Sequence, residues 1–159
     1  MSRKLAIGSD HAGYELKEFL KKNVPGVTWL DQGPANSDRT DYPDYAEKVA
    51  RLVSSGELEA GVLVCGSGIG MCITANKFPG VRAAVVESVQ TALLSRQHND
   101  ANVLCLGARI LPAELAKSIV ETWLNTAFEG GRHADRLKKI TDLEKRNAKH
   151  PSSGSASKK

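Results

Sequence analysis

The chain has 159 residues, 41% hydrophobic and 25% charged, values that are ordinary for one folded globular domain. The formal net charge of the chain is +4. Residues 132–159 hold nine Lys or Arg and three Asp or Glu, a net of +6, whereas residues 1–131 hold thirteen basic and fifteen acidic residues, a net of −2. Because the excess of positive charge lies in one terminal segment without interleaved aromatics, a nucleic-acid-binding protein is disfavoured.

Targeting and metal signals are weak along the whole chain. No apolar run approaches the roughly 20 residues of a membrane span, and the first ten residues run into a strand rather than a signal peptide. The three cysteines, Cys65, Cys72 and Cys105, form no CxxC pair, and their odd number suits a reducing compartment. We therefore expect a cytoplasmic protein without a zinc site and without a membrane partner.

Apolar runs alternate with helical patterns from the N-terminus onward. In chain order the sequence predicts a strand at 4–9, a helix at 14–22, a strand at 27–30, a helix starting near Pro43, a strand at 60–64, a helix opening near Ile69, a strand at 81–86, and helices at 88–97 and 112–124 around a strand at 103–107. This alternation predicts an α/β domain over 1–149: a doubly wound, five-stranded parallel sheet of the flavodoxin or Rossmann-like type.

The segment after the third strand has the composition of an anion-binding loop. The strand ends in Cys65, and Gly66, Gly68 and Gly70 follow at alternate positions before a helix opens. Glycines allow successive N–H groups to turn toward one oxyanion, and the start of the helix adds the positive end of its dipole. Taken alone, a Gly-rich turn is weak evidence, and a cysteine that ends a strand more often only packs in the core.

Other chemically active side chains follow other strands. Asp10 and His11 lie in the loop after the first strand, and Arg109 lies in the loop after the fifth. In open α/β sheets ligands bind outside the carboxyl ends of the strands. These side chains and Cys65 are therefore predicted to share one site.

The last predicted helix, 132–149, differs from the others. Its apolar stripe is thin and consists of Leu137, Ile140 and Leu143. We interpret it as an arm that packs on a second subunit. Arg132 and Arg136 are one helical turn apart and either grip one phosphate or form a solvated basic face. The low-complexity residues 150–159 are expected to be disordered.

Several motifs in order along the chain identify a family. They are DHAG at 10–13, DYPD at 41–44, CGSGIG at 65–70, ANK at 75–77, SRQHNDAN at 95–102 and EGGRH at 129–133. Over residues 5–146 the chain resembles ribose-5-phosphate isomerase of type B, whose family includes isomerases for allose and galactose phosphates. The resemblance implies interconversion of ribose 5-phosphate and ribulose 5-phosphate in the non-oxidative pentose phosphate pathway, through an enediolate and without a metal or organic cofactor.

The resemblance also implies catalytic roles. Cys65 would take the proton from C2; a glutamate does so in one branch of the family, but its position here is Met71. Ser67 would relay a proton between O1 and O2. His98 would open the furanose ring with help from Asp10. The backbone of Gly66, Gly68, Ile69 and Gly70 would hold the enediolate oxygens.

Substrate-binding roles follow in the same way. Asn99 and Tyr42 would orient hydroxyl groups, and the phosphate would be bound by His11, Arg109, Arg132 and Arg136. The arginines of the arm come from the neighbouring subunit in the family, so the active site would be built at a dimer interface. The sequence leaves a dimer or a tetramer open.

Two other interpretations remain open. A six-carbon substrate such as allose 6-phosphate needs the same chemistry with one more carbon between the glycine loop and the arginines. A non-catalytic phosphosugar-binding module on the same fold is the second alternative. Such a module has no need of both Cys65 and His98. Cys72 and Cys105 are interpreted as packing residues.

Overall fold

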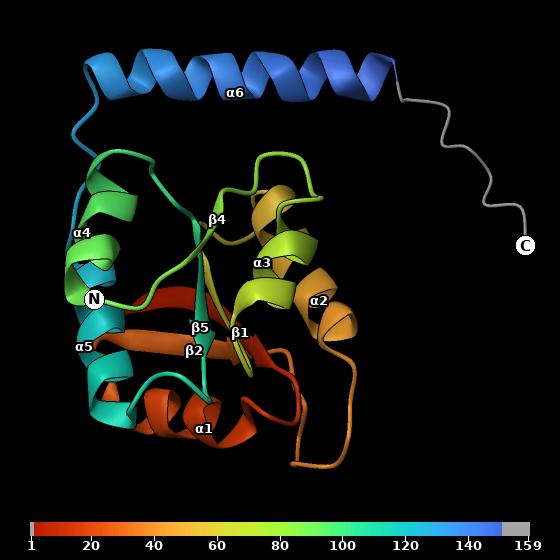
Figure 1. Ribbon diagram of the computed structural model, residues 1–159, viewed down its shortest axis with the longest axis vertical. Coiled ribbons are helices and arrows are strands. Elements are labelled where there is room, and N and C mark those ends of the chain that lie inside the picture. The colour runs from red at the N-terminus through yellow and green to blue at the C-terminus, as the bar shows by residue number, and fades with distance from the viewer. Residues whose placement is uncertain (1, 151–159) are drawn as a thin grey trace, which may run out of the picture.

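The computed structural model describes residues 2–150 and shows a parallel sheet with helices on both faces (Figure 1). The strands are β1 (Arg3–Ser9), β2 (Val27–Asp31), β3 (Gly61–Cys65), β4 (Ala83–Val85) and β5 (Val103–Gly107). The helices are α1 (Tyr14–Asn23), α2 (Tyr42–Ser54), α3 (Ile69–Ala75), α4 (Val89–Gln97), α5 (Ala113–Leu124) and α6 (Arg132–Lys149). The predicted disorder of the tail lies outside the described residues, except at His150.

The strand order is β2-β1-β3-β5-β4, and all neighbouring strands are parallel. The predicted five-stranded, doubly wound architecture is confirmed. Its last two strands exchange places relative to the flavodoxin order. The residues of β5 are all buried, which suits an interior strand, whereas β4 has three partly exposed residues and forms an edge.

Each face of the sheet has its own apolar core. One core joins β1, β3 and β5 to α1, α4 and α5 through residues such as Leu20, Leu104 and Ile119. The other joins the opposite face to α2 and α3 through residues such as Val49 and Met71. Between β1 and β3 the chain changes its winding direction, because β2 lies on one side of β1 and β3 on the other. Such a switch point leaves a crevice at the carboxyl ends of the two strands.

Helix α6 runs along the top of Figure 1 and contacts the layered body through Glu144, whose carboxylate accepts a hydrogen bond from the N–H of Gly80 over 3.1 Å. His133 is its one buried residue among those described, while Ile140 and Leu143 are 52% and 49% exposed. Within residues 2–150 no helix has the length and apolar character needed to cross a membrane. Among residues 2–150, nothing covers Ile140 and Leu143 of the predicted apolar stripe, whereas Leu137 is partly buried.

Candidate active site

A cavity of about 330 Å³ opens at the carboxyl ends of β1, β3 and β5. Its lining consists of Asp10, Tyr42, Cys65, Gly66, Ser67, Gly70, Arg109 and Ile110. Seven of these eight residues belong to the predicted site. The side chains that the sequence placed after separate strands are thus brought together at the switch point.

Cys65 is the last residue of β3 and is 4% exposed. The N–H of Gly68 donates a hydrogen bond to its Sγ over 3.1 Å, which fixes the sulfur at the edge of the cavity. Gly68 has φ +80°, and a Cβ there would lie 3.0 Å from the carbonyl carbon of Leu106. Only glycine therefore combines this left-handed backbone with this close approach to β5.

Ser67 and Gly70 complete the loop before and inside the first turn of α3. The Oγ of Ser67 accepts a hydrogen bond from the N–H of Ile69 over 3.2 Å, which leaves its own O–H proton to donate elsewhere. A Cβ on Gly70 would lie 2.6 Å from the ring of Tyr42, so this ring packs directly on the loop backbone. Ile69 itself is 54% exposed and points away from the core.

Asp10 follows β1 and is 7% exposed. Its Oδ1 accepts a hydrogen bond from the N–H of Gly13 over 3.0 Å, and its own N–H donates to the carbonyl of Val64 on β3. A Cβ on Gly13 would clash with that same carbonyl. The DHAG motif therefore closes a tight turn against β3 and aims a carboxylate into the cavity.

His11 and Arg109 also lie at the carboxyl ends of the strands. The Nδ1 of His11 lies 3.0 Å from the carbonyl oxygen and 3.3 Å from the nitrogen of Thr40, so the loop after β2 orients its ring. The N–H of Arg109 donates to the carbonyl of Gly66 over 3.0 Å, and its guanidinium lies over Gly66. Arg109 has no acidic partner among residues 2–150, so its charge is available to an anion.

The remaining predicted residues lie at the opposite ends of the strands, the amino ends. His98 ends α4, and Asn99 follows it in the turn that leads into β5. At the end of this turn the carbonyl of Asn102 accepts a hydrogen bond from Gly61, the first residue of β3. A strand as long as β3 spans about 13 Å. His98 and Cys65 of one chain are therefore separated by at least the length of a strand.

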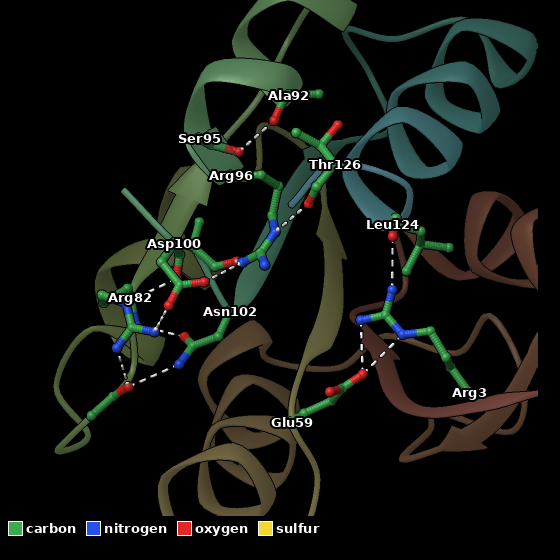
Figure 2. Close-up of polar contacts among 12 residues, drawn as sticks. Arg3, Glu59, Arg82, Ala92, Ser95, Arg96, Asp100, Asn102, Leu124 and Thr126 are labelled. Atoms are coloured by element: carbon green, nitrogen blue, oxygen red, sulfur yellow. Dashed lines mark hydrogen bonds and ion pairs between the residues drawn. The ribbon is translucent and has the colours of Figure 1, made fainter. Parts of the chain in front are cut away.

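The turn around His98 is held by a dense polar network, which Figure 2 shows. The carboxylate of Asp100 accepts hydrogen bonds from Arg96 at 2.9 Å and from Arg82 at 3.2 Å. Arg82 and Arg96 also donate to the carbonyls of Asp100 and Ala101. Asp100 has φ +46°, an uncommon backbone conformation for a residue with a side chain. The network thus fixes the turn that presents His98 and Asn99.

The start of α6 adjoins this turn. The ring of His98 stacks on that of His133, with centroids 4.3 Å apart and an interplanar angle of 13°. Burial lowers the pKa of His133, with His98 and Arg132 adding to the effect. Arg132 and Arg136 are exposed beside this stack. The second set of predicted residues therefore forms its own cluster, remote from Cys65.

Comparisons with known proteins agree with the motifs. Residues 5–140 match the model of the Ribose/Galactose Isomerase family. Ribose-5-phosphate isomerase B of Escherichia coli is 49% identical over 146 residues, covering 91% of this chain and 98% of the relative. The chain belongs to the ribose/galactose isomerase family.

Solved structures of family members extend the match to the fold. Type B ribose 5-phosphate isomerase of Trypanosoma brucei superimposes with a TM-score of 0.86 at 47% identity, over 90% of this chain and 99% of that one. Ribose-5-phosphate isomerase B of Mycoplasma genitalium, solved with bound ribulose-5-phosphate, gives a TM-score of 0.86 at 42% identity over 91% and 98%. The family resemblance carried by the motifs is confirmed, and the protein is an isomerase.

Met71 stands at the alternative position for the catalytic base, and it cannot act as one. Met71 is fully buried in the core on the α2–α3 face, and it is absent from the cavity lining. A thioether also accepts a proton poorly. Among the residues that line the cavity, Cys65 and Asp10 carry a thiol and a carboxyl group, which are the strongest candidate bases beside the hydroxyls of Ser67 and Tyr42.

One cluster offers metal ligands in principle. Ligand atoms of His98, Glu129 and His133 lie within 4.8 Å of one another. The nearly parallel rings direct their nitrogen lone pairs side by side rather than toward one point, which a tetrahedral or octahedral ion requires. The arrangement fits a histidine stack better than a metal centre. The absence of a cofactor stays a prediction.

Sequence reasoning overlooked three residues that shape the site. Ile110 lines the cavity, and the backbone of Thr40 orients His11. Lys17 is fully buried and donates to both carboxylate oxygens of Asp31 and to the carbonyl of Pro34, which anchors the loop that carries Thr40. The polar residue types of that loop were the available signal, but they did not indicate a buried lysine.

Proposed function

We propose that the protein interconverts ribose 5-phosphate and ribulose 5-phosphate by moving a proton between C2 and C1 through an enediolate. The observation that carries this proposal is the single cavity in which a cysteine thiol, a glycine loop and an unpaired arginine meet. The names of the family members, one of them solved with ribulose-5-phosphate, support the substrate. A cytoplasmic location remains an expectation from the sequence.

The base in this mechanism is Cys65, acting as its thiolate. Its sulfur takes the proton from C2 of the open-chain aldose and later returns it to C1. Backbone N–H groups of the loop stabilise the negative charge that develops on the enediolate oxygens. The free O–H of Ser67 passes a proton between O2 and O1. Asp10, held by Gly13, contacts the ring oxygens before the ring opens.

The phosphate is bound at the far end of the substrate from Cys65. Arg109 supplies a permanent positive charge, and His11, oriented by Thr40, supplies a hydrogen bond. A phosphate carries nearly two negative charges at neutral pH, more than one arginine neutralises. Arg132 and Arg136 provide the additional charge, and they come from a second copy of the chain.

The proposed assembly is a homodimer whose two sites are each shared between subunits. Two observations support it. His98 and Asn99 lie a strand's length from Cys65 within one chain, yet ring opening and proton transfer act on one small sugar. Among residues 2–150, nothing covers Ile140 and Leu143 of α6, which are 52% and 49% exposed. A second copy that receives α6 solves both problems.

The test is steady-state turnover of ribose 5-phosphate by wild type and Cys65→Ala, with EDTA present and allose 6-phosphate assayed in parallel. We expect metal-independent turnover of the pentose that falls by about 10³-fold or more in the variant, the scale of a lost general base. Cys105→Ala is the matched control, because it removes a thiol that lies outside the cavity lining. Faster turnover of the hexose would transfer the assignment to a six-carbon substrate. Binding of both sugars without turnover would leave a phosphosugar-binding module.

A further inference from the structure

Three thiols gather on the α3 side of the sheet, and the proposed mechanism uses one of them. Cys105 of β5 is fully buried and belongs to the same core cluster as Cys65. Cys72 of α3 packs against that cluster and is half-buried. All three cysteines are free. Cys72 and Cys105 thus form a thiol pair between a helix and the sheet that has no part in isomerisation.

Hydrogen bonds hold the Cys72 sulfur against the edge of the sheet. Its Sγ lies 3.4 Å from the carbonyl oxygen of Ala83 and 3.5 Å from the amide nitrogen of Asn76. Ala83 belongs to β4, whose residue Val85 is in register with Cys105. The side chain of Asn76 pins this corner through two further bonds to the backbone of Ala83, at 2.8 and 3.0 Å. The helix therefore presents Cys72 to β4 and β5 in a fixed position.

The two thiols pack at one core cluster but are chemically unequal. The Cys105 thiol donates a hydrogen bond to the Cys72 sulfur and, against the opposing effect of burial, lowers the pKa of Cys72 to about 7, with Val85 and Asn76 assisting. Burial raises the pKa of Cys105 well above its usual range. Near neutrality Cys72 is thus a substantial fraction thiolate, the reactive form, while Cys105 stays protonated beside it.

We propose that Cys72 and Cys105 form a reversible oxidation site, in which a peroxide converts the two thiols into a disulfide that joins α3 to β5. The Cys72 thiolate attacks one oxygen of hydrogen peroxide, the O–O bond breaks, and the hydroxide that leaves takes a proton from solvent to become water. The Cys72 sulfenic acid then reacts with the Cys105 thiol: the S–O bond breaks, the S–S bond forms and a second water leaves. Both thiols are oxidised together by two electrons, and the peroxide is reduced.

Backbone geometry excludes a disulfide between Cys105 and Cys65. Cys105 is in register with Leu63, so Cys65 lies two residues further along the neighbouring strand. With strands about 4.8 Å apart and about 3.3 Å per residue, this diagonal is about 8 Å between Cα atoms. Disulfides require Cα atoms no more than about 7 Å apart. The Cys65 sulfur is also engaged by Gly68.

The test is performed on full-length Cys65→Ala, which removes the active-site thiol as a competing target, and on wild type. Each protein is treated with hydrogen peroxide near neutral pH, then unfolded, and free thiols and intact mass are measured with and without dithiothreitol. We expect Cys65→Ala to lose both thiols and two hydrogens in mass, with full recovery on reduction. Peptide mapping should find residues 72 and 105 linked within one chain.

Two further variants in the Cys65→Ala background separate the roles of the two thiols. Cys72→Ser should leave Cys105 unreacted, because a buried, protonated thiol is a poor nucleophile. Cys105→Ala should instead accumulate a Cys72 sulfenic acid that dimedone traps. If Cys65→Ala keeps both thiols, or acquires oxygen on Cys72 while Cys105 remains free, the proposal is overturned. A disulfide that links two chains overturns it as well. None of these readouts depends on isomerase activity.

Discussion

The proposed site has two halves, one at the carboxyl ends of the parallel strands (the carboxyl edge) and one at their amino ends (the amino edge), and the two halves are held in different ways. At the carboxyl edge, Cys65 and Asp10 are buried at strand ends, and glycines fit the backbone around them with little space to spare. At the amino edge, Asn99, Arg132 and Arg136 are exposed, on a turn and on the surface helix α6. One half is preorganised by its own chain, whereas the other is positioned to meet a different chain.

This difference connects stability to function. Groups that exchange protons with carbon need a fixed geometry, which buried strand ends provide. Groups that complete the site from outside need to be accessible before assembly, so they lie on surface elements. Substitutions in the body should therefore lower both the free energy of unfolding and the turnover. Substitutions in the arm should lower only the turnover, and they do so in the assembled protein.

The largest expected effect is recovery of activity on mixing two inactive variants. Cys65→Ala and His98→Asn should each be nearly inactive. In a mixed dimer, one site combines Cys65 from one chain with His98 from the other and is intact. Random reassembly makes half of the dimers mixed, so about a quarter of the wild-type sites should return. Turnover of ribose 5-phosphate after co-refolding or co-expression measures this fraction.

The control for this experiment mixes Cys65→Ala with Asp10→Asn, whose positions line the same cavity. Every site in that mixed dimer keeps one defect, so no activity should return. If Cys65→Ala with His98→Asn also recovers nothing while size measurements show mixed dimers, each site is contained in one chain. The division of the molecule into two halves would then be wrong.

A smaller effect is expected from the ion pair between the buried Lys17 and the partly exposed Asp31 of the body. Burial alone would raise the pKa of Asp31, but hydrogen bonds from Lys17 and Lys21 outweigh it and lower that pKa. Asp31→Asn removes the nearer of the two carboxylates that pair with the buried Lys17, leaving Glu18 at 3.4 Å, and should cost about 2 kcal/mol of unfolding free energy at pH 7. Because the folded pKa lies below the unfolded one, this stabilisation is present above about pH 3.9 and is lost as the pH falls further.

The matched variant lies on the arm. The hydrogen bond from Lys138 lowers the pKa of Asp142, but this pair is exposed. Asp142→Asn should leave the urea unfolding midpoint unchanged, since exposed pairs contribute little. Urea titrations at a series of pH values compare the two variants. Equal losses at both positions would show that the arm and the body do not differ in this respect.

Gly68→Ala should lower the free energy of unfolding by about 2 kcal/mol, because residue 68 has a left-handed backbone and an added Cβ would press on Leu106. It should also reduce kcat, because the loop that holds Cys65 is displaced. Gly26→Ala is the control: Gly26 has φ +77°, and no atom lies within 4 Å of the place that an added Cβ would take, so it carries the backbone cost without the packing cost. Thermal unfolding and steady-state kinetics separate these contributions. Identical kcat losses in both variants would contradict the role of the loop.

Most of the body was predictable, because local patterns determine it. Alternating apolar runs predicted the sheet, and the rule that ligands bind at the carboxyl ends of strands brought Asp10, Cys65 and Arg109 together. The order of β4 and β5 was not predicted, although Arg82 within the fourth apolar run is a signal of an edge strand. The pairing depends on non-local contacts, which periodicity does not encode.

Other features could not be predicted from local sequence patterns, because they too depend on contacts between distant elements. Lys17 has the sequence pattern of a solvated residue, because lysines are seldom fully buried. Its burial depends on Asp31, which lies in a different element. Cys72 and Cys105 were interpreted as packing, because their spacing along the chain matches no thiol motif. The separation of His98 from Cys65 became visible only once the direction of α4 and β5 was known.

The smallest expected effect comes from Asp100, which organises the turn at the amino edge (Figure 2). Asp100→Asn keeps a side chain that tolerates φ +46° but removes the charge that pairs with Arg82 and Arg96. Partly exposed pairs of this kind contribute up to about 1 kcal/mol each, so the unfolding midpoint should fall slightly. Turnover should fall several-fold, because the turn carries His98 and Asn99 toward the second chain.

The companion variant Asp100→Ala loses the charge and also the side chain that suits a left-handed backbone. Its turnover should therefore fall further than that of Asp100→Asn. Arg51→Ala, which breaks an exposed pair with Glu47 on α2, controls for the loss of any surface ion pair. If Asp100→Asn and Arg51→Ala have equal kcat, the network stabilises the fold without positioning the turn. A graded loss from Asn to Ala would instead show that the geometry of the amino edge, though exposed, matters to turnover as the geometry of the cavity does.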